Sequence, residues 1–284
     1  MRWWCSATDA PWSWTWRPYP GVWLFVALLV AGYLRLRRRA GPARAAWRGR
    51  HTAAFAGGAL AVWAALDWPI GALGAGYLVS VHTVQYLLLD FVAAPLLLLG
   101  VPAEGWAHLA AGRRLGPALR FAARPLVALV VYNAAVLGTH VPPVVDGLMR
   151  AQVGSFLVDL AWIVGGLALW WPVLAPPAVA QVSPPLKIAY LFASTILPTA
   201  PAAFLTFAEY PIYSLYELAP RATGLSAHDD QQIGGLLMKL AADPVIWAAM
   251  AIIFFRWSSE EGRVQSPAVG HRPPAVTSRT PADG

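Results

Sequence analysis

The sequence has one cysteine and few charged residues. Cys5 is the only cysteine in a chain of 284 residues, which excludes an intramolecular disulfide and a thiolate cluster. Any metal site must therefore use histidine, methionine, carboxylate or amide side chains. Charged residues make up 12% of the chain and hydrophobic residues 58%, which is more apolar surface than a soluble core of this size would use. The composition predicts a membrane protein.

The first 18 residues lack the features of a cleavable signal peptide. They have no basic region followed directly by an apolar core and a small-residue cleavage site. They form an aromatic-rich segment, residues 1–18, that contains Cys5. We expect an inert cysteine in a mobile start, with a reactive thiol or an intermolecular disulfide as the alternatives.

Segments of alternating polarity are also missing, which disfavours a transmembrane β-barrel. Seven apolar stretches instead have about the 20 residues that a helix needs to cross a bilayer. They are residues 19–34, 52–68, 75–99, 125–141, 155–174, 185–208 and 232–255. The sequence predicts an all-α polytopic bundle of about seven transmembrane helices.

The predicted membrane domain covers residues 19–256. Four prolines within its spans, each of which removes a backbone hydrogen bond, predict kinks that frame a cavity: Pro95, Pro198, Pro201 and Pro244. Residues 257–284 lack periodic apolar positions, so we expect a disordered cytoplasmic tail.

The distribution of positive charge predicts the orientation. Sixteen of the 21 lysines and arginines fall on alternate loops and in the tail, a pattern that excludes a nucleic-acid partner and favours a lipid bilayer. They are Arg35, Arg37, Arg38, Arg39, Arg44, Arg48, Arg50, Arg113, Arg114, Arg120, Arg124, Lys187, Arg256, Arg263, Arg272 and Arg279. The positive-inside rule puts these loops in the cytoplasm, with the amino terminus outside and the carboxyl terminus inside.

Ionisable residues inside the spans are costly and informative; they are His82, Asp90, Asp159, Lys239 and Asp243. One interpretation is structural: His82 forms hydrogen bonds between helices, and Lys239 and Asp243 form an i,i+4 pair. A second is a metal site built from imidazoles of different helices. A third is a proton or ion path through Asp90, Asp159 and Asp243. No nucleophile elbow, phosphate-binding loop or zinc-protease motif is present, and we do not expect an enzyme.

Three segments resemble a known family. They are Ser80-Val-His82-Thr-Val-Gln85-Tyr86 continuing to Ala94-Pro95-Leu-Leu-Leu-Leu-Gly100-Val-Pro102, then Thr139-His140-Val-Pro142 with Trp170-Trp171-Pro172, and Asp229-Asp230-Gln231-Gln232-Ile-Gly234-Gly235-Leu-Leu-Met238. In order and spacing they are similar to the seven-span CtaG-like family of cytochrome c oxidase assembly factors, which serve caa3-type oxidases. The resemblance covers about residues 18–256.

The resemblance implies a bacterial inner-membrane (plasma-membrane) protein that helps copper reach the outer face of a haem-copper oxidase. Its implied partners are cytochrome c oxidase subunits and a periplasmic copper donor. The predicted topology also places several polar residues together on the outer side. From the resemblance and this cluster, the candidate metal ligands are His82, His140, Met238, His228 and Asp159. The supporting residues are Gln85 and Tyr86, which share a helical face with His82, the polar gate of Asp230 and Gln231, and Lys239.

The sequence departs from the family pattern at three positions. Tyr86 and Asp159 stand where histidines are common, and Lys239 stands where tryptophan is usual. Two further functions therefore stay open. One is a copper or proton-coupled transporter, and the other is a non-metal scaffold for oxidase subunits, in which His82 and His140 serve only as hydrogen-bond partners.

Overall fold

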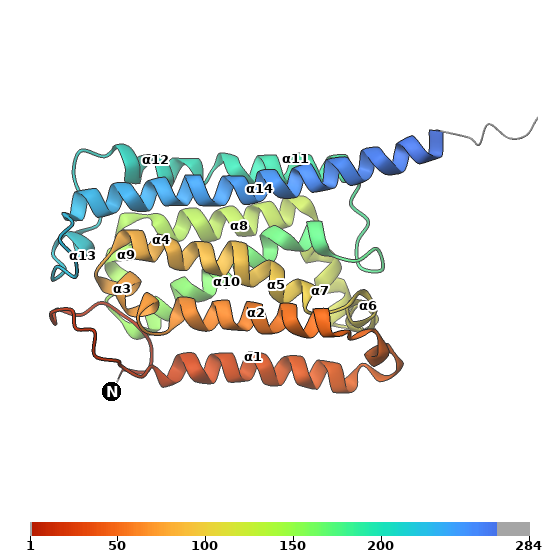
Figure 1. The fold of residues 1–284 in the computed structure, drawn as a ribbon, viewed down its shortest axis with the longest axis horizontal. Helices are drawn as coiled ribbons and strands as arrows, with labels where there is room; N and C mark the ends of the chain where they lie inside the picture. Colours follow the sequence, from red (N-terminus) through yellow and green to blue (C-terminus); the bar gives the residue numbers. More distant parts are fainter. Residues whose placement is uncertain (1, 266–284) are drawn as a thin grey trace, which may run out of the picture.

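The computed structural model describes residues 2–265, which form a bundle of helices and contain no strand within that range (Figure 1). The elements in chain order are α1 (Pro20–Arg39), η1 (Gly41–Ala46), α2 (Gly49–Leu66), α3 (Ile70–Gly76), α4 (Val79–Leu87), the π-helix η2 (Leu88–Ala93), α5 (Ala94–Leu99), α6 (Ala103–Ala110), α7 (Leu115–Ala122), α8 (Pro125–His140), α9 (Pro142–Leu148), α10 (Gln152–Leu174), α11 (Pro184–Ile196), α12 (Thr199–Phe207), α13 (Ser214–Glu217) and α14 (Ala227–Gln265).

The helices confirm the predicted all-α membrane bundle. Among the described residues, five helical segments are long and apolar enough to cross a membrane: Pro20–Arg39, Val79–Leu99, Gln152–Leu174, Pro184–Phe207 and Ala227–Gly262. Two bent pairs raise the number to seven, α2 with α3 at 45° and α7 with α8 at 77°. The chain is thus a multi-pass membrane protein with five to seven spans.

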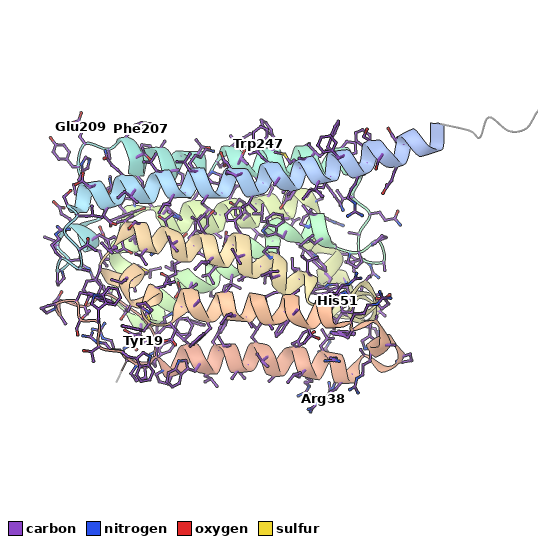
Figure 2. The ribbon with its side chains drawn as sticks, viewed as in Figure 1. Tyr19, Arg38, His51, Phe207, Glu209 and Trp247 are labelled. Atoms are coloured by element: carbon purple, nitrogen blue, oxygen red, sulfur yellow. The ribbon has the colours of Figure 1, made fainter. Side chains whose placement is uncertain are left out.

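Charge separates along the long axis of the bundle. One end carries residues 2–18, α3, α9, α13 and the start of α14, and we call it the amino end (Figure 1). The other carries η1, α6 and α7, and we call it the arginine end. Figure 2 shows Tyr19 and Glu209 at the amino end and Arg38 and His51 at the arginine end. The segregation of basic loops is as predicted; the side of the membrane that each end faces remains a prediction.

Small residues bring the central helices into close contact. A Cβ added to Gly166 on α10 would lie 2.7 Å from the Cα of Asp90. One added to Gly235 on α14 would lie 2.8 Å from the carbonyl oxygen of Ala202 on α12. Such close backbone approach is the usual way in which membrane helices gain packing contacts. It places α4, η2, α10 and α14 around one core.

The prolines in the spans have different local effects. The π-helix η2 ends at Ala93, two residues before Pro95, whose nitrogen has no hydrogen to donate to the preceding turn. The carbonyl of Asp90 in η2 accepts a hydrogen bond from the indole of Trp170 at 2.8 Å. Pro198 separates α11 from α12, whereas α14 continues through Pro244.

The expectation of a mobile amino-terminal start is wrong. The side chains of Trp4 and Cys5 are both 1% exposed. The Cys5 thiol donates to the Leu66 carbonyl oxygen at 3.2 Å, and the Ala7 amide donates to the Met149 carbonyl oxygen at 2.9 Å. Burial also raises the pKa of the Cys5 thiol well above its ordinary value, which makes it a poor nucleophile.

The carboxyl-terminal boundary also differs from the prediction. Helix α14 continues to Gln265, so the first nine residues of the expected tail, 257–265, are helical. The rest of that tail, residues 266–284, lies outside the described residues.

Candidate functional site

Two buried histidines lie side by side near the amino end. His82 is in the middle of α4, and His140 is the last residue of α8. Their side chains are 2% and 5% exposed, and their ring centroids are 6.4 Å apart. The structure therefore brings together the two leading candidates from the sequence, which are 58 positions apart in the chain.

The hydrogen bonds of these rings leave nitrogens free. Nδ1 of His140 lies 2.7 Å from the carbonyl oxygen of Val136, so in the neutral ring it carries the proton and Nε2 has the lone pair. Within the described part of the chain, Nε2 of His140 and both ring nitrogens of His82 are buried without a hydrogen-bond partner. Buried polar groups are nearly always paired, so this arrangement calls for an explanation.

Aromatic side chains surround the histidine pair. The ring centroid of Trp162 is 4.7 Å from that of His82 and 6.3 Å from that of His140. The Trp162 indole donates to Thr139 Oγ1 at 2.8 Å. The ring centroid of Tyr86 is 5.5 Å from that of His140, and the ring centroid of Tyr216 is 5.8 Å from that of His82. These contacts fix the imidazoles in an apolar surrounding from which bulk water is largely excluded.

Asp159 is engaged by two neighbours. Its Oδ1 accepts a hydrogen bond from Gln85 Nε2 at 3.1 Å, and its Oδ2 accepts one from the Trp4 indole at 2.7 Å. Trp4 thus joins the amino-terminal segment to the polar residues of α4 and α10. The sequence contained a weak signal for Trp162, which follows Asp159 by three positions on one helical face, but none for the position of Trp4.

Three of the remaining candidates have contacts away from the imidazoles. His228 Nε2 lies 2.9 Å from the Ala208 carbonyl oxygen. Lys239 forms an ion pair with Asp243 at 2.8 Å and donates to Thr199 Oγ1 at 2.7 Å, which confirms the predicted i,i+4 pair. Met238 is buried and lines a small cavity with Tyr86 and Lys239.

Asp230 and Gln231 fasten the start of α14 to its neighbours. Asp230 accepts hydrogen bonds from the Val79 amide at 2.6 Å and from the amide and hydroxyl of Ser80. It therefore caps the N-terminus of α4 from another helix. Gln231 accepts from the Ile212 amide at 2.7 Å. Asp230 thus holds in place the helix that carries His82, whereas Gln231 ties α14 to the end of α12 and the segment that follows it.

Asp90 is a further buried polar residue of the interior, besides His82 and His140. Its side chain is fully buried in η2, and neither carboxyl oxygen has a partner among residues 2–265. Its neighbours include Gly165 and Gly166 of α10. The hydroxyls of Tyr86 and Tyr132, which lie on α4 and α8, are 3.1 Å apart.

One side cavity reaches His140 but not His82. It has a volume of about 400 Å³ and is lined by His140, Pro142, Phe204 and Tyr213, among others. Phe204 is largely exposed, so the cavity lies at the lateral surface of the bundle. Across the described residues, no group of three or more His, Cys, Asp or Glu side chains could hold a metal ion. A metal here would depend on the two imidazoles.

The fold and site define a multi-pass helical membrane protein with a buried histidine pair at one end. The family model described as cytochrome c oxidase caa3 assembly factor matches residues 9–260, which is most of the chain. The protein belongs to this family, as the sequence motifs indicated. The comparison with curated proteins finds no match, and neither does the comparison with solved structures.

Proposed function

We propose that this protein binds copper at His82 and His140 and supports the maturation of a cytochrome c oxidase by handing that copper on. The observation that carries the proposal is the pair of buried rings with three nitrogens unpaired within residues 2–265. Ligating histidines commonly donate the second ring nitrogen to a carbonyl group, and His140 makes such a bond to Val136.

The donor set fits copper as cargo. Imidazole nitrogen is a good ligand for copper, and a centroid separation of 6.4 Å is close to the value of about 6 Å expected when one ion with bonds of about 2 Å joins two imidazoles. The aromatic neighbours of the two rings suit an ion of low charge such as Cu(I). In this proposal Asp159 acts through its hydrogen bond with Gln85, which shares a face of α4 with His82, and Met238, which lines a separate small cavity, is not a ligand.

The direction of transfer follows from the predicted orientation. In this proposal the amino end faces the outside of a bacterial plasma membrane, where a periplasmic copper donor and the oxidase subunits meet the protein. The cavity beside His140 is the approach to the pair. At the same end, Trp4 bonds to Asp159, which also accepts from Gln85, one helical turn from His82. The protein assists assembly and is not an enzyme.

Copper binding by the detergent-purified protein tests the proposal. The double variant His82→Ala/His140→Ala should lose the stoichiometric Cu(I) that the wild type binds, because both ligands are gone. His108→Ala, an exposed histidine of α6 at the arginine end, is the matched control and should bind like the wild type. Absence of stoichiometric copper from the wild type, or its retention by the double variant, would overturn the proposal.

A transporter is the alternative that Asp90 favours. Its buried carboxyl group, without a partner among the described residues, lies in a π-helix, a feature frequent at functional sites, and intramembrane carboxyl groups mark proton paths in pumps. Flux of copper or protons into vesicles that contain the purified protein separates the two functions. An assembly factor gives no flux, whereas a transporter gives flux that Asp90→Asn abolishes.

A scaffold without metal is the second alternative. It is favoured by the bond from the Tyr213 hydroxyl to the backbone carbonyl oxygen of His140 at 2.9 Å, which joins the end of α8 to the segment before α13. Cells that carry the His82→Ala/His140→Ala variant decide between the functions. Full oxidase activity in these cells supports the scaffold, and oxidase lacking copper supports delivery.

A further inference from the structure

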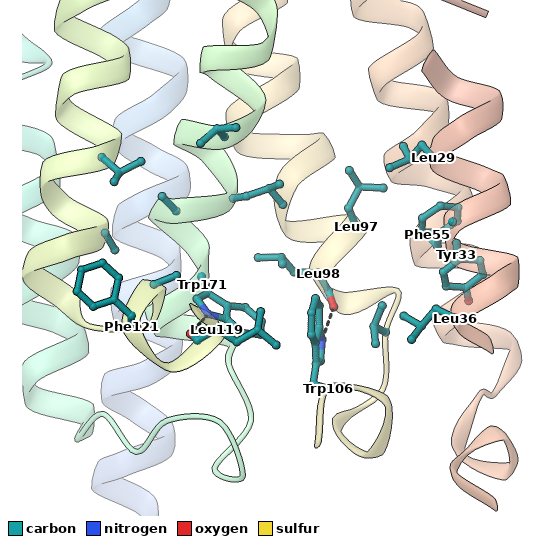
Figure 3. A pocket seen from close by; sticks show the side chains of 18 of the residues that line it. Leu29, Tyr33, Leu36, Phe55, Leu97, Leu98, Trp106, Leu119, Phe121 and Trp171 are labelled. Atoms are coloured by element: carbon teal, nitrogen blue, oxygen red, sulfur yellow. Dashed lines mark hydrogen bonds between the residues drawn. The ribbon is translucent and has the colours of Figure 1, made fainter. Parts of the chain in front are cut away.

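A second, larger cavity lies toward the arginine end, on the side of the bundle covered by α1. It has a volume of about 750 Å³, within the range of about 300–1,000 Å³ that is usual for ligand pockets. Figure 3 shows Leu29, Tyr33 and Leu36 of α1 on one side and Trp171 and Phe121 on the other, with Leu97 and Leu98 of α5 between them. The lining is almost entirely apolar.

The sequence of α1 and its neighbours creates this cavity. Near the amino end, Trp4 fills the space between α1 and α10, with its ring 6.0 Å from Phe25 and 5.0 Å from Phe156. Farther along, α1 presents Gly32 to the cavity, and a Cβ added there would have nothing within 4 Å. The gap between α1 and α10 is therefore closed by a side chain at one end and left open at the other.

Polar donors lie at the arginine end of this cavity. Tyr33 lines it with a side chain only 6% exposed, and its ring stacks on Phe55 with centroids 3.8 Å apart. Within residues 2–265, the hydroxyl of Tyr33 and the Nε of Arg37, one helical turn later, are buried without a hydrogen-bond partner. On the opposite side, the guanidinium of Arg124 lies 5.4 Å from the ring centre of Phe121.

We propose that this cavity holds one acyl chain of an anionic phospholipid, with the phosphate at Tyr33 and Arg37. The apolar length of the cavity suits a hydrocarbon chain, because no polar group of a ligand would find partners there. A phosphate needs donors and positive charge, and the arginine end supplies both. Basic pockets between membrane helices bind lipid headgroups in this way. This site is separate from the histidine pair and does not depend on copper.

Lipid analysis of the purified full chain tests the proposal. The protein is reconstituted from delipidated material with equal amounts of phosphatidylglycerol and phosphatidylcholine, re-purified in mild detergent and examined by native mass spectrometry. The wild type should retain one phospholipid, with phosphatidylglycerol preferred. Gly32→Phe should lose it, because the new ring occupies the cavity. Gly138→Phe is the matched control, since Gly138 is also an exposed helical glycine with open space around its Cβ, and it should retain the lipid.

The headgroup contacts have their own variants. Tyr33→Phe keeps the ring stacked on Phe55 but removes the hydroxyl, and Arg37→Gln removes one charge. Each variant should still retain a phospholipid but should prefer phosphatidylglycerol over phosphatidylcholine less strongly than the wild type. For Arg37→Gln, the preference should fall by about five-fold. Both readouts remain available if Gly32→Phe does not fold.

Three results would overturn the proposal. They are equal lipid retention by Gly32→Phe and Gly138→Phe, a wild type that does not prefer phosphatidylglycerol, and a native extract that contains an isoprenoid or a haem in place of phospholipid. The last result would assign the cavity to a neutral or planar molecule instead of an anionic lipid.

Discussion

Replacing Trp4 by phenylalanine should loosen the attachment of the amino-terminal segment to the bundle. The indole donates to Asp159 at 2.7 Å, and its ring packs 5.0 Å from Phe156 and 6.0 Å from Phe25. Phenylalanine keeps one aromatic ring in these contacts and removes the N–H together with the second ring of the indole. Leaving a buried acceptor without its donor costs about 1–3 kcal/mol, so we expect the segment to open more easily by about 2 kcal/mol.

Labelling of Cys5 measures this opening directly. Cys5 is the only cysteine of the chain and is a buried member of the same segment, so a maleimide reacts with it only after local opening. A change of about 2 kcal/mol in the opening equilibrium corresponds to a rate about 30-fold higher. Mass spectrometry of timed samples of the detergent-purified protein gives the rate. In an Asp159→Asn background the Trp4→Phe effect should shrink, because the two residues share one hydrogen bond.

Trp14→Phe is the matched control. Trp14 lies in the same segment and is mostly exposed, with ring contacts to Trp12 and Trp68. Its replacement should leave the labelling rate of Cys5 unchanged. If Trp4→Phe is labelled at the wild-type rate, or if Trp14→Phe accelerates labelling equally, the hydrogen bond to Asp159 does not hold the segment closed.

Three further predictions concern the packing of the bundle. Asp230→Ala should lower the free energy of unfolding by about 1–2 kcal/mol, because α4 loses its cap. The control is Asp229→Ala, since Asp229 is exposed and is bonded to Ser226 nearby. Equal melting temperatures of the two variants would contradict the prediction. Gly166→Ala should destabilise by about 1–3 kcal/mol, since its Cβ meets Asp90 at 2.7 Å, whereas Gly138→Ala should be tolerated; equal yields and melting temperatures would show that α10 can shift. Finally, burial raises the pKa of the Cys5 thiol, so the contribution of this thiol to the free energy of unfolding is complete below the unfolded thiol's pKa of about 8.5 and is lost as pH rises. Denaturation measured from pH 7 to 10 should show a loss of stability that is smaller in Cys5→Ala. Identical pH slopes for the wild type and Cys5→Ala would refute this prediction.

Part of the candidate site was accessible from the sequence. The helical spacing of His82, Gln85 and Tyr86 put these residues on one face, and the family motifs singled out His140. The structure places Tyr86 5.5 Å from His140 and joins Gln85 to Asp159. Trp162, which contacts His82, and Trp4, which bonds to Asp159, complete the site. Hydropathy did not indicate which helices these two tryptophans would contact.

Features that depend on neighbours along the chain could be predicted from the amino-acid sequence alone. Hydropathy over about 20 residues located the spans, basic loops marked one end of the bundle, and i,i+4 spacing predicted the ion pair of Lys239 with Asp243. These signals are local, so a single sequence carries them without knowledge of how the helices pack.

Contacts between segments that are distant in the chain became visible only in the folded structure. Trp4 bonds to Asp159, 155 positions away, and Asp230 caps α4 from 151 positions beyond Val79. The pairing of the two imidazoles, the unpaired Asp90 and the cavity beside α1 likewise depend on which faces of the helices meet. Hydropathy indicates that a helix is buried in a membrane but does not specify its neighbour, because lipid tails and apolar side chains offer similar surroundings.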